Sequence, residues 1–318
     1  MIVVVAVSAL IVLRDKSDSS TQSTTGAITP SVDQSTIASA GDKDSVGLIT
    51  DDPTCASWEP IARTLSEQQK NGWDRRDPRI PASSWTARQR LEYDAVEKAM
   101  RNAADQTVAL IYLTPHRVMR ELYEQSVAYW RAYADSLENY TAEDDALALV
   151  ANSTSGALVW ICAAQTYGSA DARKPLIARP LAPISVAAIN DPANPTRFMN
   201  VPSPVCDDWS EASRRFDANI DQWARAVDPN APASQWPLEL QSLAARAALV
   251  LQENASEVAN MGATSQNPTL SDFASLAAQY QRAYAQAIPS YTPADNYLNS
   301  AAADLVVAIN QACRAALN

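Results

Sequence analysis

The residues of this chain that could carry out chemistry are one histidine and several adjacent acid pairs. Paired carboxylates can serve as general acid and base, and a histidine can exchange a proton near neutral pH. The acid pairs are Asp51-Asp52, Asp144-Asp145 and Asp207-Asp208. Each pair lies near a predicted helix start, where carboxylates interact favourably with the helix dipole. His116 also lies at a predicted helix start. We expect structural roles for all of them, with a carboxylate-based hydrolase as the minor alternative.

Motifs for other chemistries do not occur in the sequence. It contains no G-x-S-x-G, Walker loop, dinucleotide glycine fingerprint or HExxH motif. With seven glycines in 318 residues, loops that cradle phosphate are difficult to build. A net charge of −11 argues against nucleic-acid binding, which requires clustered Lys and Arg. We therefore predict no enzymatic activity, no cofactor, no metal and no nucleic-acid partner.

An internal duplication dominates the sequence. Residues 55–162 align with residues 206–313 without a gap, at an offset of 151 positions. The matched positions are rich in Cys, Trp, Pro and Tyr, which are the residue types least often matched by chance. We call the two aligned regions copy one and copy two. The residues kept in both copies indicate what the unit needs to fold, and they do not identify a reaction.

Each copy carries two cysteines, Cys55 and Cys162 in copy one and Cys206 and Cys313 in copy two. Paired cysteines are typical of an oxidising compartment. Zinc is the weaker alternative, because there is no C-x-x-C and only one histidine. Four cysteines allow three pairings, and the repeat alone does not select one. The order of the predicted helices selects one pairing.

Capping signals and apolar spacing predict four helices in each copy. Thr141 with Asp144, Thr292 with Asp295, and Thr86-x-x-Gln89 fit helix starts. The predicted helices are 57–71, 86–112, 116–138 and 142–165 in copy one, and 208–226, 237–261, 270–288 and 293–316 in copy two. No stretch alternates with the period of a strand. The sequence therefore predicts an all-α fold of two tandem four-helix-bundle-like repeats.

In an up-down-up-down bundle the first helix begins and the fourth helix ends at the same end of the bundle. The two cysteines of each copy occupy these positions. We therefore predict disulfides Cys55–Cys162 and Cys206–Cys313.

Further residues are kept in both copies at the same offset. They are Trp58 and Trp209; Asp77, Trp85, Asp228 and Trp236 of a D-P-x-x-P-A-S-x-W loop; Tyr129, Arg131, Tyr133, Tyr280, Arg282 and Tyr284; and Asp144 and Asp295. The loop is expected to be rigid, with its tryptophan plugging the bundle; docking of a partner is the alternative. The tyrosines share a helical face and are expected to pack between helices rather than to line a ligand groove.

Two ion pairs are predicted from these shared residues. Arg131 and Arg282 point away from the tyrosine face and are expected to pair with a carboxylate of their own copy. Asp144 and Asp295 are the candidates.

The N-terminal region differs in composition from the two copies. Residues 1–14 are apolar up to Leu13, and we interpret them as a membrane anchor truncated at its start. A signal peptide and a buried segment are the alternatives. Residues 15–50 are rich in Ser, Thr and Asp and are predicted to form a disordered stalk. The expected domains are helical repeat 1 at 51–166, a Pro-rich connector at 167–204 and helical repeat 2 at 205–318.

The combination of an N-terminal span, a Ser/Thr stalk, a C-x-x-W start, the D-P-x-x-P-A-S-x-W loop, the R-A-Y-A helix and a closing cysteine resembles a family. It is a group of uncharacterised exported, single-span membrane proteins of mycobacteria and related actinobacteria with a duplicated, disulfide-closed helical domain. The resemblance covers about residues 51–318 and implies a location at the cell membrane, with the C-terminal domains outside the cytoplasm. It carries no activity with it.

Three functions follow in order of preference. The first is a non-catalytic interaction, scaffold or accessory subunit of a cell-envelope complex. The second is a carrier or sensor that holds a small apolar ligand between helices. The third is the hydrolase mentioned above.

A partner surface is sought where the copies diverge. Copy one has Ile111, Tyr112, Leu113, His116 and Arg117 where copy two has small or polar residues. These five residues form the candidate partner surface. The alternative is that the apolar residues complete the helix core.

Overall fold

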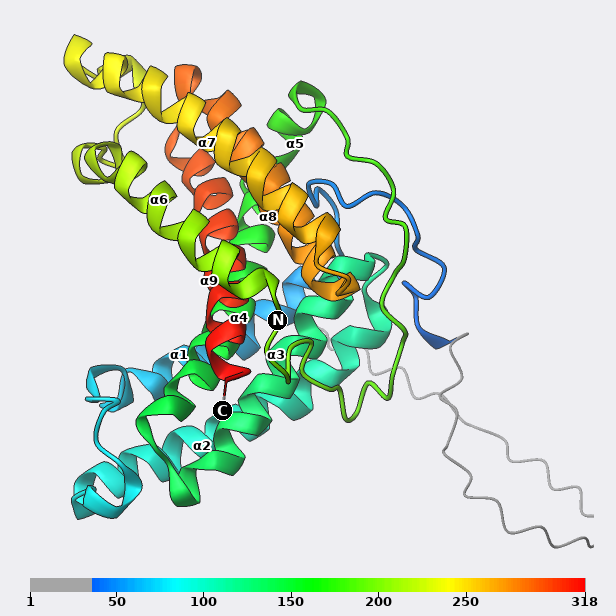
Figure 1. Ribbon diagram of the computed structural model, residues 1–318, viewed down its shortest axis with the longest axis vertical. Helices are drawn as coiled ribbons and strands as arrows, with labels where there is room; N and C mark the ends of the chain where they lie inside the picture. The colour runs from blue at the N-terminus through cyan, green and yellow to red at the C-terminus, as the bar shows by residue number, and fades with distance from the viewer. Residues whose placement is uncertain (1–35, 318) are drawn as a thin grey trace, which may run out of the picture. The chain divides into compact units, whose positions relative to one another are not determined.

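The computed structural model describes residues 36–317, and the predicted anchor and the first part of the predicted stalk lie outside this range. Within it the protein contains helices and no β-strand, which confirms the all-α prediction. The α-helices are α1 (Cys55–Gln69), α2 (Ala87–Leu113), α3 (Arg117–Ser136), α4 (Asp145–Thr166), α5 (Ser169–Arg173), α6 (Val205–Ala226), α7 (Leu238–Thr264), α8 (Pro268–Ala287) and α9 (Asn296–Ala315) (Figure 1).

The helix boundaries follow the sequence repeat. α2 and α7 begin and end at positions that differ by 151, and so do α3 and α8. α4 and α9 also begin 151 positions apart. α6 is the exception, because it continues to Ala226 whereas α1 ends at Gln69. In each copy, helices that follow one another in the chain pack side by side, and the first helix also contacts the fourth.

Both predicted disulfides are present. Cys55 is bonded to Cys162, with a Cα–Cα distance of 5.3 Å, and Cys206 to Cys313, with a distance of 5.5 Å. Each bond connects residues 107 positions apart. No free cysteine occurs among the described residues, so the zinc alternative for the cysteines was wrong.

Local hydrogen bonds explain where several helices begin. At the start of α2, Thr86 Oγ1 accepts from Gln89 N at 3.2 Å and Thr86 N donates to Gln89 Oε1 at 2.9 Å. The same reciprocal arrangement joins Thr141 to Asp144 before α4, and Thr292 to Asp295 before α9. The capping signals in the sequence therefore give the helix starts correctly, because the partner is only three residues away.

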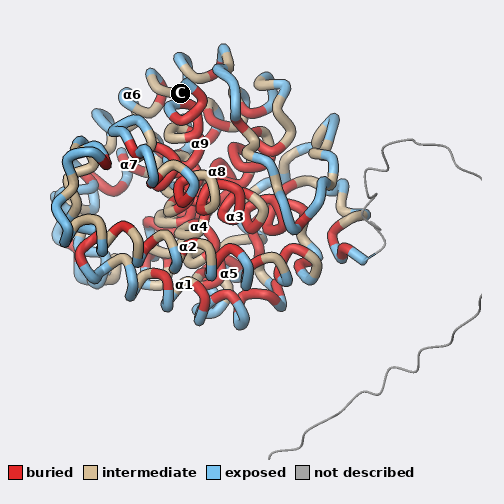
Figure 2. Tube along the Cα trace, turned by 90° about the horizontal axis from the view of Figure 1, so that it is seen from below, coloured by how far each residue is buried: buried red, intermediate tan, exposed pale blue. Residues whose placement is uncertain are grey.

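The two copies meet along α4 and α9, which form the most extensive helix–helix contact. Alanine lines much of both helices, and small side chains allow a close approach of the backbones. Figure 2 shows buried residues concentrated around α3, α4, α8 and α9. Residues 142–166 are also long and apolar enough to span a membrane, but this stretch is mostly buried inside the protein. Packing between the copies accounts for its composition.

Residues 36–50 are ordered and pack on the helices, so the prediction of a disordered stalk up to residue 50 was wrong for this part. Ala38 N donates to Tyr112 O at 2.9 Å. The segment is rich in small and polar residues, yet its few large apolar side chains find cover on the helical core. These buried side chains are Ile37, Val46, Leu48 and Ile49.

Matching lead-in segments precede the first helix of each copy, residues 42–50 in copy one and residues 193–201 in copy two. The copy-two segment lies on α3 of copy one, where Tyr129 Oη donates to Met199 O at 3.2 Å. The backbone of Ile49 in the copy-one segment lies beside the Tyr280 hydroxyl of α8. Each lead-in segment therefore contacts the third helix of the other copy.

The connector between the copies contains the short helix α5 and an extended stretch after it. Ile177 packs against the core. Leu181 and Ile184 are fully exposed. Prolines at 180 and 183 keep this stretch extended and prevent it from folding back.

Candidate functional site

A groove of about 1060 Å³ lies between α1 and α4 of copy one. We call it the α1–α4 groove. Its size is in the range of pockets that bind small molecules or partner side chains. The residues of α1 that line it are Cys55, Ala56, Trp58, Glu59, Ala62, Arg63, Leu65, Ser66 and Gln69, and those of α4 include Asn152, Ser155, Gly156, Val159, Trp160, Cys162 and Gln165.

Buried tryptophans form the floor of the groove. Trp58 and Trp130 stack with ring centroids 6.1 Å apart, and Tyr123 meets Trp58 edge-on at 5.4 Å. The indole N–H groups of Trp58 and Trp130 have no hydrogen-bond partner in the described structure. Buried donors without an acceptor are rare because each costs free energy. The floor of the groove thus consists of aromatic rings, and it contains two buried indole N–H groups without an acceptor.

Polar side chains form the rim. Glu59 and Arg63 make an exposed ion pair one helical turn apart on α1, with Oε1 and Nη1 3.0 Å apart. Gln69 Nε2 donates to Asn152 Oδ1 at 2.8 Å, which ties the end of α1 to α4. An apolar floor with a polar rim is the usual anatomy of a protein-binding surface.

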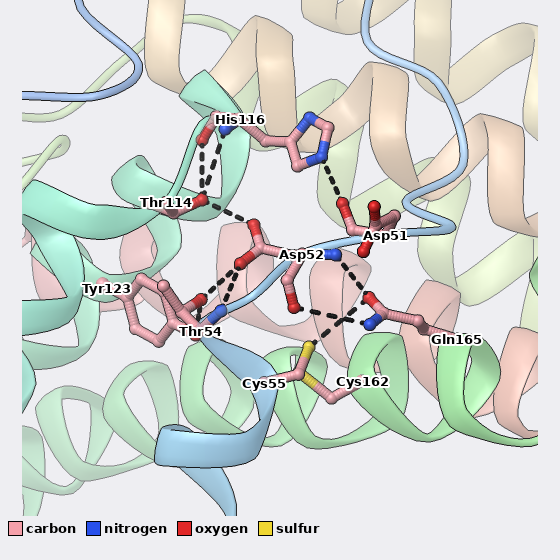
Figure 3. Close-up of a disulfide and its surroundings, with 9 residues drawn as sticks. All are labelled: Asp51, Asp52, Thr54, Cys55, Thr114, His116, Tyr123, Cys162 and Gln165. Atoms are coloured by element: carbon pink, nitrogen blue, oxygen red, sulfur yellow. Dashed lines mark hydrogen bonds between the residues drawn. A yellow bond between two sulfur atoms is a disulfide. The ribbon is translucent and has the colours of Figure 1, made fainter.

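The other end of the groove is held by the disulfide and by a network around the buried Asp52 (Figure 3). Asp52 Oδ1 accepts from Thr54 N at 2.9 Å and from Thr54 Oγ1 at 2.5 Å. Asp52 Oδ2 accepts from Thr114 Oγ1 at 2.6 Å. Thr54 Oγ1 lies 2.9 Å from the Tyr123 hydroxyl. Both carboxylate oxygens are thus engaged in holding the start of α1.

The neighbouring backbone is held by two further side chains. Gln165 Oε1 of α4 accepts from Asp52 N at 2.8 Å. His116 Nε2 lies 2.8 Å from Asp51 O. A carbonyl oxygen only accepts, so the His116 proton must be on Nε2. His116 therefore anchors the chain in front of α1, and this contact uses the nitrogen as a donor rather than as a base.

This network belongs to copy one only. Asp52, Thr54, Tyr123 and Gln165 correspond to Ser203, Val205, Ala274 and Ala316 in copy two. The floor differs as well, because Trp130 and Trp160 correspond to Gln281 and Gln311. Tryptophans present in a single copy were the sequence signal that could have located the groove.

The loop residues kept in both copies make equivalent hydrogen bonds in copy one and in copy two. Trp85 Nε1 donates to Ile80 O at 2.9 Å, and Trp236 Nε1 donates to Ala231 O at 3.0 Å. Trp85 is half-buried and Trp236 is buried. Asp77 accepts from Arg79, and Asp228 from Asn230, within the loop itself. The pKa of Asp77 is lowered to about 2 by its hydrogen bonds from Arg79.

The paired tyrosines and tryptophans lie inside the protein. Tyr129, Tyr133, Tyr280 and Tyr284 are all buried, as are Trp58 and Trp209. Trp73 Nε1 donates to Tyr133 Oη at 3.0 Å. Burial raises the pKa of each of the four tyrosines.

Arg131 pairs with a carboxylate of its own copy, as predicted, but the partner is Asp105 and not Asp144. The predicted pair of Arg282 with Asp295 was wrong, because Asp295 pairs with Arg173. Arg131 Nη2 bonds to Asp105 at 2.8 Å and Arg131 also donates to the Ala193 carbonyl of the other copy. Arg282 donates to Ala255 O at 3.4 Å. Asp144 caps α4.

Asp295 was the candidate partner of Arg282. It caps the start of α9, and its Oδ2 accepts from Nη2 of Arg173 in the connector at 2.9 Å. Asp295 is thus engaged by Arg173 and by the cap, and Arg282 bonds to another group.

The candidate partner surface is only partly exposed. Leu113 is exposed and Tyr112 and His116 are half-buried, whereas Ile111 and Arg117 are buried. Arg117 points into the contact between α3 and α8, where its Nε lies 2.6 Å from Asp272 Oδ2. Ile111 is part of the buried core at the end of α2, and Arg117 is held by Asp272 of the second copy, so both residues have structural roles.

Metal binding has no candidate in the described residues, since no group of three or more His, Cys, Asp or Glu side chains lies close enough to hold an ion.

Comparison with known proteins gives one family. The family model for Mycobacterial ESX-1 associated protein matches residues 37–317. An uncharacterized protein of Mycolicibacterium smegmatis (strain MKD8) is 44% identical over 314 residues, which cover 99% of this chain and 82% of the relative. No solved structure matches the chain. The family match begins at the buried Ile37, one residue after the first described residue.

Proposed function

Because the chain belongs to the family of mycobacterial ESX-1 associated proteins, we propose that it is a non-catalytic interaction or accessory subunit of a secretion-associated complex in the cell envelope. The two disulfides support a location in an oxidising compartment outside the cytoplasm. In this proposal the N-terminal apolar segment anchors the chain in the membrane. Two tandem four-helix repeats then face the extracytoplasmic side, and the matching helix boundaries of the two copies support this organisation.

A non-catalytic role is supported by the use that the fold makes of its reactive groups. Asp52 accepts three hydrogen bonds from nearby threonines. His116 donates to a backbone carbonyl. Asp144 and Asp295 cap helices. The groups that could have formed a carboxylate or histidine site are thus engaged in holding the backbone.

The observation that carries the proposal is the α1–α4 groove. α1 has 15 residues and is therefore about 22 Å long, enough to lie beside several turns of another helix. Amphipathic helices bind in such grooves by placing apolar side chains on the floor and polar ones at the rim. We propose that the groove receives an amphipathic helix of a protein from the secretion-associated complex.

A photocrosslinking experiment tests this. Ala62 lies on the lining of the groove and is half-buried, so a photoreactive phenylalanine analogue at this position in the full chain is expected to crosslink to one envelope protein in mycobacterial cells. Ser213 is the equivalent of Ala62 in copy two and is also half-buried. It serves as the matched control and is expected to give no such product.

A pair of tryptophan variants tests whether the interaction depends on the groove itself rather than on the exposure of the labelled position. Ala62→Trp fills the groove and is expected to abolish the interaction, whereas Ser213→Trp is expected to leave it unchanged. Equal crosslinking from both positions, or an interaction that survives Ala62→Trp in a folded protein, would contradict the proposal.

The same groove supports a second candidate function, a carrier or sensor for a small apolar envelope ligand. The observation that favours it is the pair of buried tryptophans on the floor. Native mass spectrometry of the protein extracted from its own membranes would then detect a bound lipid, and Ala62→Trp would remove it. A lipid-free protein that still crosslinks to a partner would exclude the carrier and keep the first proposal.

A further inference from the structure

The connector between the two copies presents large apolar side chains to solvent. Leu181 is 93% exposed and Ile184 is fully exposed. Single apolar residues on a protein surface are ordinary, but these two lie three positions apart on one extended segment. This segment runs along the outside of the helices between α5 and α6 (Figure 1). We call residues 178–185 the connector motif.

Prolines, rather than hydrogen bonds, set the conformation of the connector motif. Residues 179–190 make no backbone–backbone hydrogen bond within the described part of the chain. Pro180 and Pro183 fix their own φ at about −65°, and each restricts the residue before it, Arg179 or Ala182, to extended conformations. Most of the run from 179 to 183 is therefore restricted before any partner binds.

Burial along the segment repeats every three residues. The half-buried positions are Ile177, Pro180, Pro183 and Val186, and the two residues between each of them are exposed. A polyproline II helix has three residues per turn, so this is the pattern expected when one edge of such a helix lies on the protein. The chain bends at Ile184, where the straight run ends. The proline edge thus rests on the helices, and Leu181 and Ile184 are turned to solvent.

The motif also carries an unpaired positive charge. Arg179 is exposed, and it forms no ion pair with any residue of the described range 36–317. It directly precedes the first proline of the motif. A partner that covers Leu181 and Ile184 would therefore gain from a carboxylate near Arg179.

The spacing of the prolines indicates how a partner would bind the segment. In a β-strand, alternate N–H groups point to opposite edges. Pro180 and Pro183 lack an N–H group and lie an odd number of positions apart, so both edges of a strand formed here would lack a donor. Recognition of a polyproline II segment does not need these donors, because such segments dock in grooves lined by aromatic side chains.

A lipid bilayer fits the motif less well. Leu181 and Ile184 together bury less apolar surface than one fatty acyl chain, which by itself binds bilayers only marginally. The net charge of the chain is −11, so an anionic membrane surface would repel it. A protein groove, in contrast, can enclose both side chains.

We propose that the connector motif is a docking segment for a partner protein whose groove is lined by aromatic side chains. The rings of the partner hold Leu181 and Ile184, and a carboxylate beside the groove pairs with Arg179. Because the segment is already extended, little conformational entropy is lost on binding. This proposal does not rest on the α1–α4 groove, since no residue of the connector motif lines that groove.

Photocrosslinking from the motif tests the proposal in the full chain. A photoreactive phenylalanine analogue replaces Ala182, which is exposed, and the crosslinked residue of the partner is identified by mass spectrometry. We expect one protein product in mycobacterial cells, with the crosslinked residue among the aromatic side chains of a groove. Val201 is an exposed connector residue outside the motif, and the same analogue there should give no such product. A lipid product, no product, or a partner residue outside an aromatic groove would overturn the proposal.

Variants of the labelled chain test the role of the prolines. Pro180→Ala with Pro183→Ala leaves the apolar side chains in place but frees the backbone, and should lower the yield of the product roughly tenfold. Pro202→Ala, an exposed connector proline outside the motif, is the matched control and should leave the yield unchanged. Thermal unfolding verifies that each variant is folded. An undiminished yield in the folded double variant would contradict the docking mode.

A last variant separates the connector motif from the α1–α4 groove. Ala62→Trp fills the groove and should leave the product from position 182 unchanged. Leu181→Ser with Ile184→Ser should remove that product in a chain that still crosslinks from position 62. Loss of the position-182 product in Ala62→Trp would place the contact in the groove and overturn this proposal.

Discussion

At the residue scale, the most unusual group is Glu121 of α3. It is fully buried, neither carboxyl oxygen has a hydrogen-bond partner, and the nearest cation is Arg120 at 3.8 Å. Burial raises its pKa well above the ordinary value, and the charges of Asp272 and Glu124 add to the effect against the opposing charges of Arg120 and Arg117.

Asp272 of α8 is the repeat equivalent of Glu121. Asp272 pairs with Arg117, with Oδ2 2.6 Å from Nε, and Arg117 also contacts Asp42. The two equivalent carboxyl groups thus differ in their partners, because only Asp272 has an arginine within hydrogen-bond distance.

Glu121 makes stability depend on pH with a defined sign. Above the ordinary glutamate pKa of about 4.5 the unfolded chain loses this proton, whereas the folded protein keeps it. The folded state then binds more protons, so stability falls as pH rises from this point. We predict that Glu121→Gln stabilises the protein at pH 8 more than at pH 5, measured by chemical denaturation.

Glu59→Gln on the exposed rim is the control for this prediction and should change stability little at either pH. Burial raises the pKa of Glu124 to about 7, so Glu124 also lowers stability as pH rises. Because Glu124 is present in both the unaltered protein and the Glu121→Gln variant, the difference in stability between these two proteins isolates Glu121. An unchanged pH dependence in Glu121→Gln would show that this carboxyl is charged in the folded state.

At the element scale, the contact between α4 and α9 depends on a glycine. A Cβ at Gly156 would lie 2.2 Å from Asp304 Oδ2 of α9. Asp304 accepts from Trp160 Nε1 at 2.9 Å, and burial raises its pKa to about 7. The absence of a side chain at position 156 thus allows one copy to place a carboxyl group against the other.

We predict that Gly156→Ala destabilises the protein by about 1–3 kcal/mol through steric overlap, although alanine favours helix by about 1 kcal/mol over glycine. Gly156→Ala with Asp304→Ala removes the overlap and should recover more stability than the two single changes predict by addition. Thermal unfolding of the four proteins measures this coupling. Additive effects would mean that α4 and α9 adjust without strain.

At the scale of the whole described structure, the two copies form one core. One continuous cluster of buried residues includes members of both copies. Each lead-in segment contacts the other copy. The Tyr129 hydroxyl donates a hydrogen bond to Met199 O, and the Tyr280 hydroxyl lies beside the backbone of Ile49. The tyrosines kept in both copies therefore contribute to the joining of the copies as well as to the packing within each one.

We expect a core defect in copy two to destabilise copy one. Leu305 of α9 is fully buried, and Leu305→Ala should cost about 2–5 kcal/mol. Hydrogen exchange of the most protected amides should then accelerate to the same extent in α3 as in α8. Acceleration confined to α8 would indicate that the copies unfold separately.

Features that depend on neighbours in the chain or on the repeat could be predicted from the sequence. The capping boxes place helix starts because their partners are three residues apart. The cysteine pairs follow from helix order. Apolar periodicity gave the all-α class, since it reflects one buried face of each helix.

The contacts between the copies could not be predicted from the sequence. The bond of Arg131 to Ala193, the burial of Arg117 against Asp272 and the ordering of residues 36–50 involve groups far apart in the chain. The α1–α4 groove is a space between elements, and its shape depends on how side chains of different helices fill it. Such contacts are fixed by packing of the two copies on each other, which local propensity does not encode.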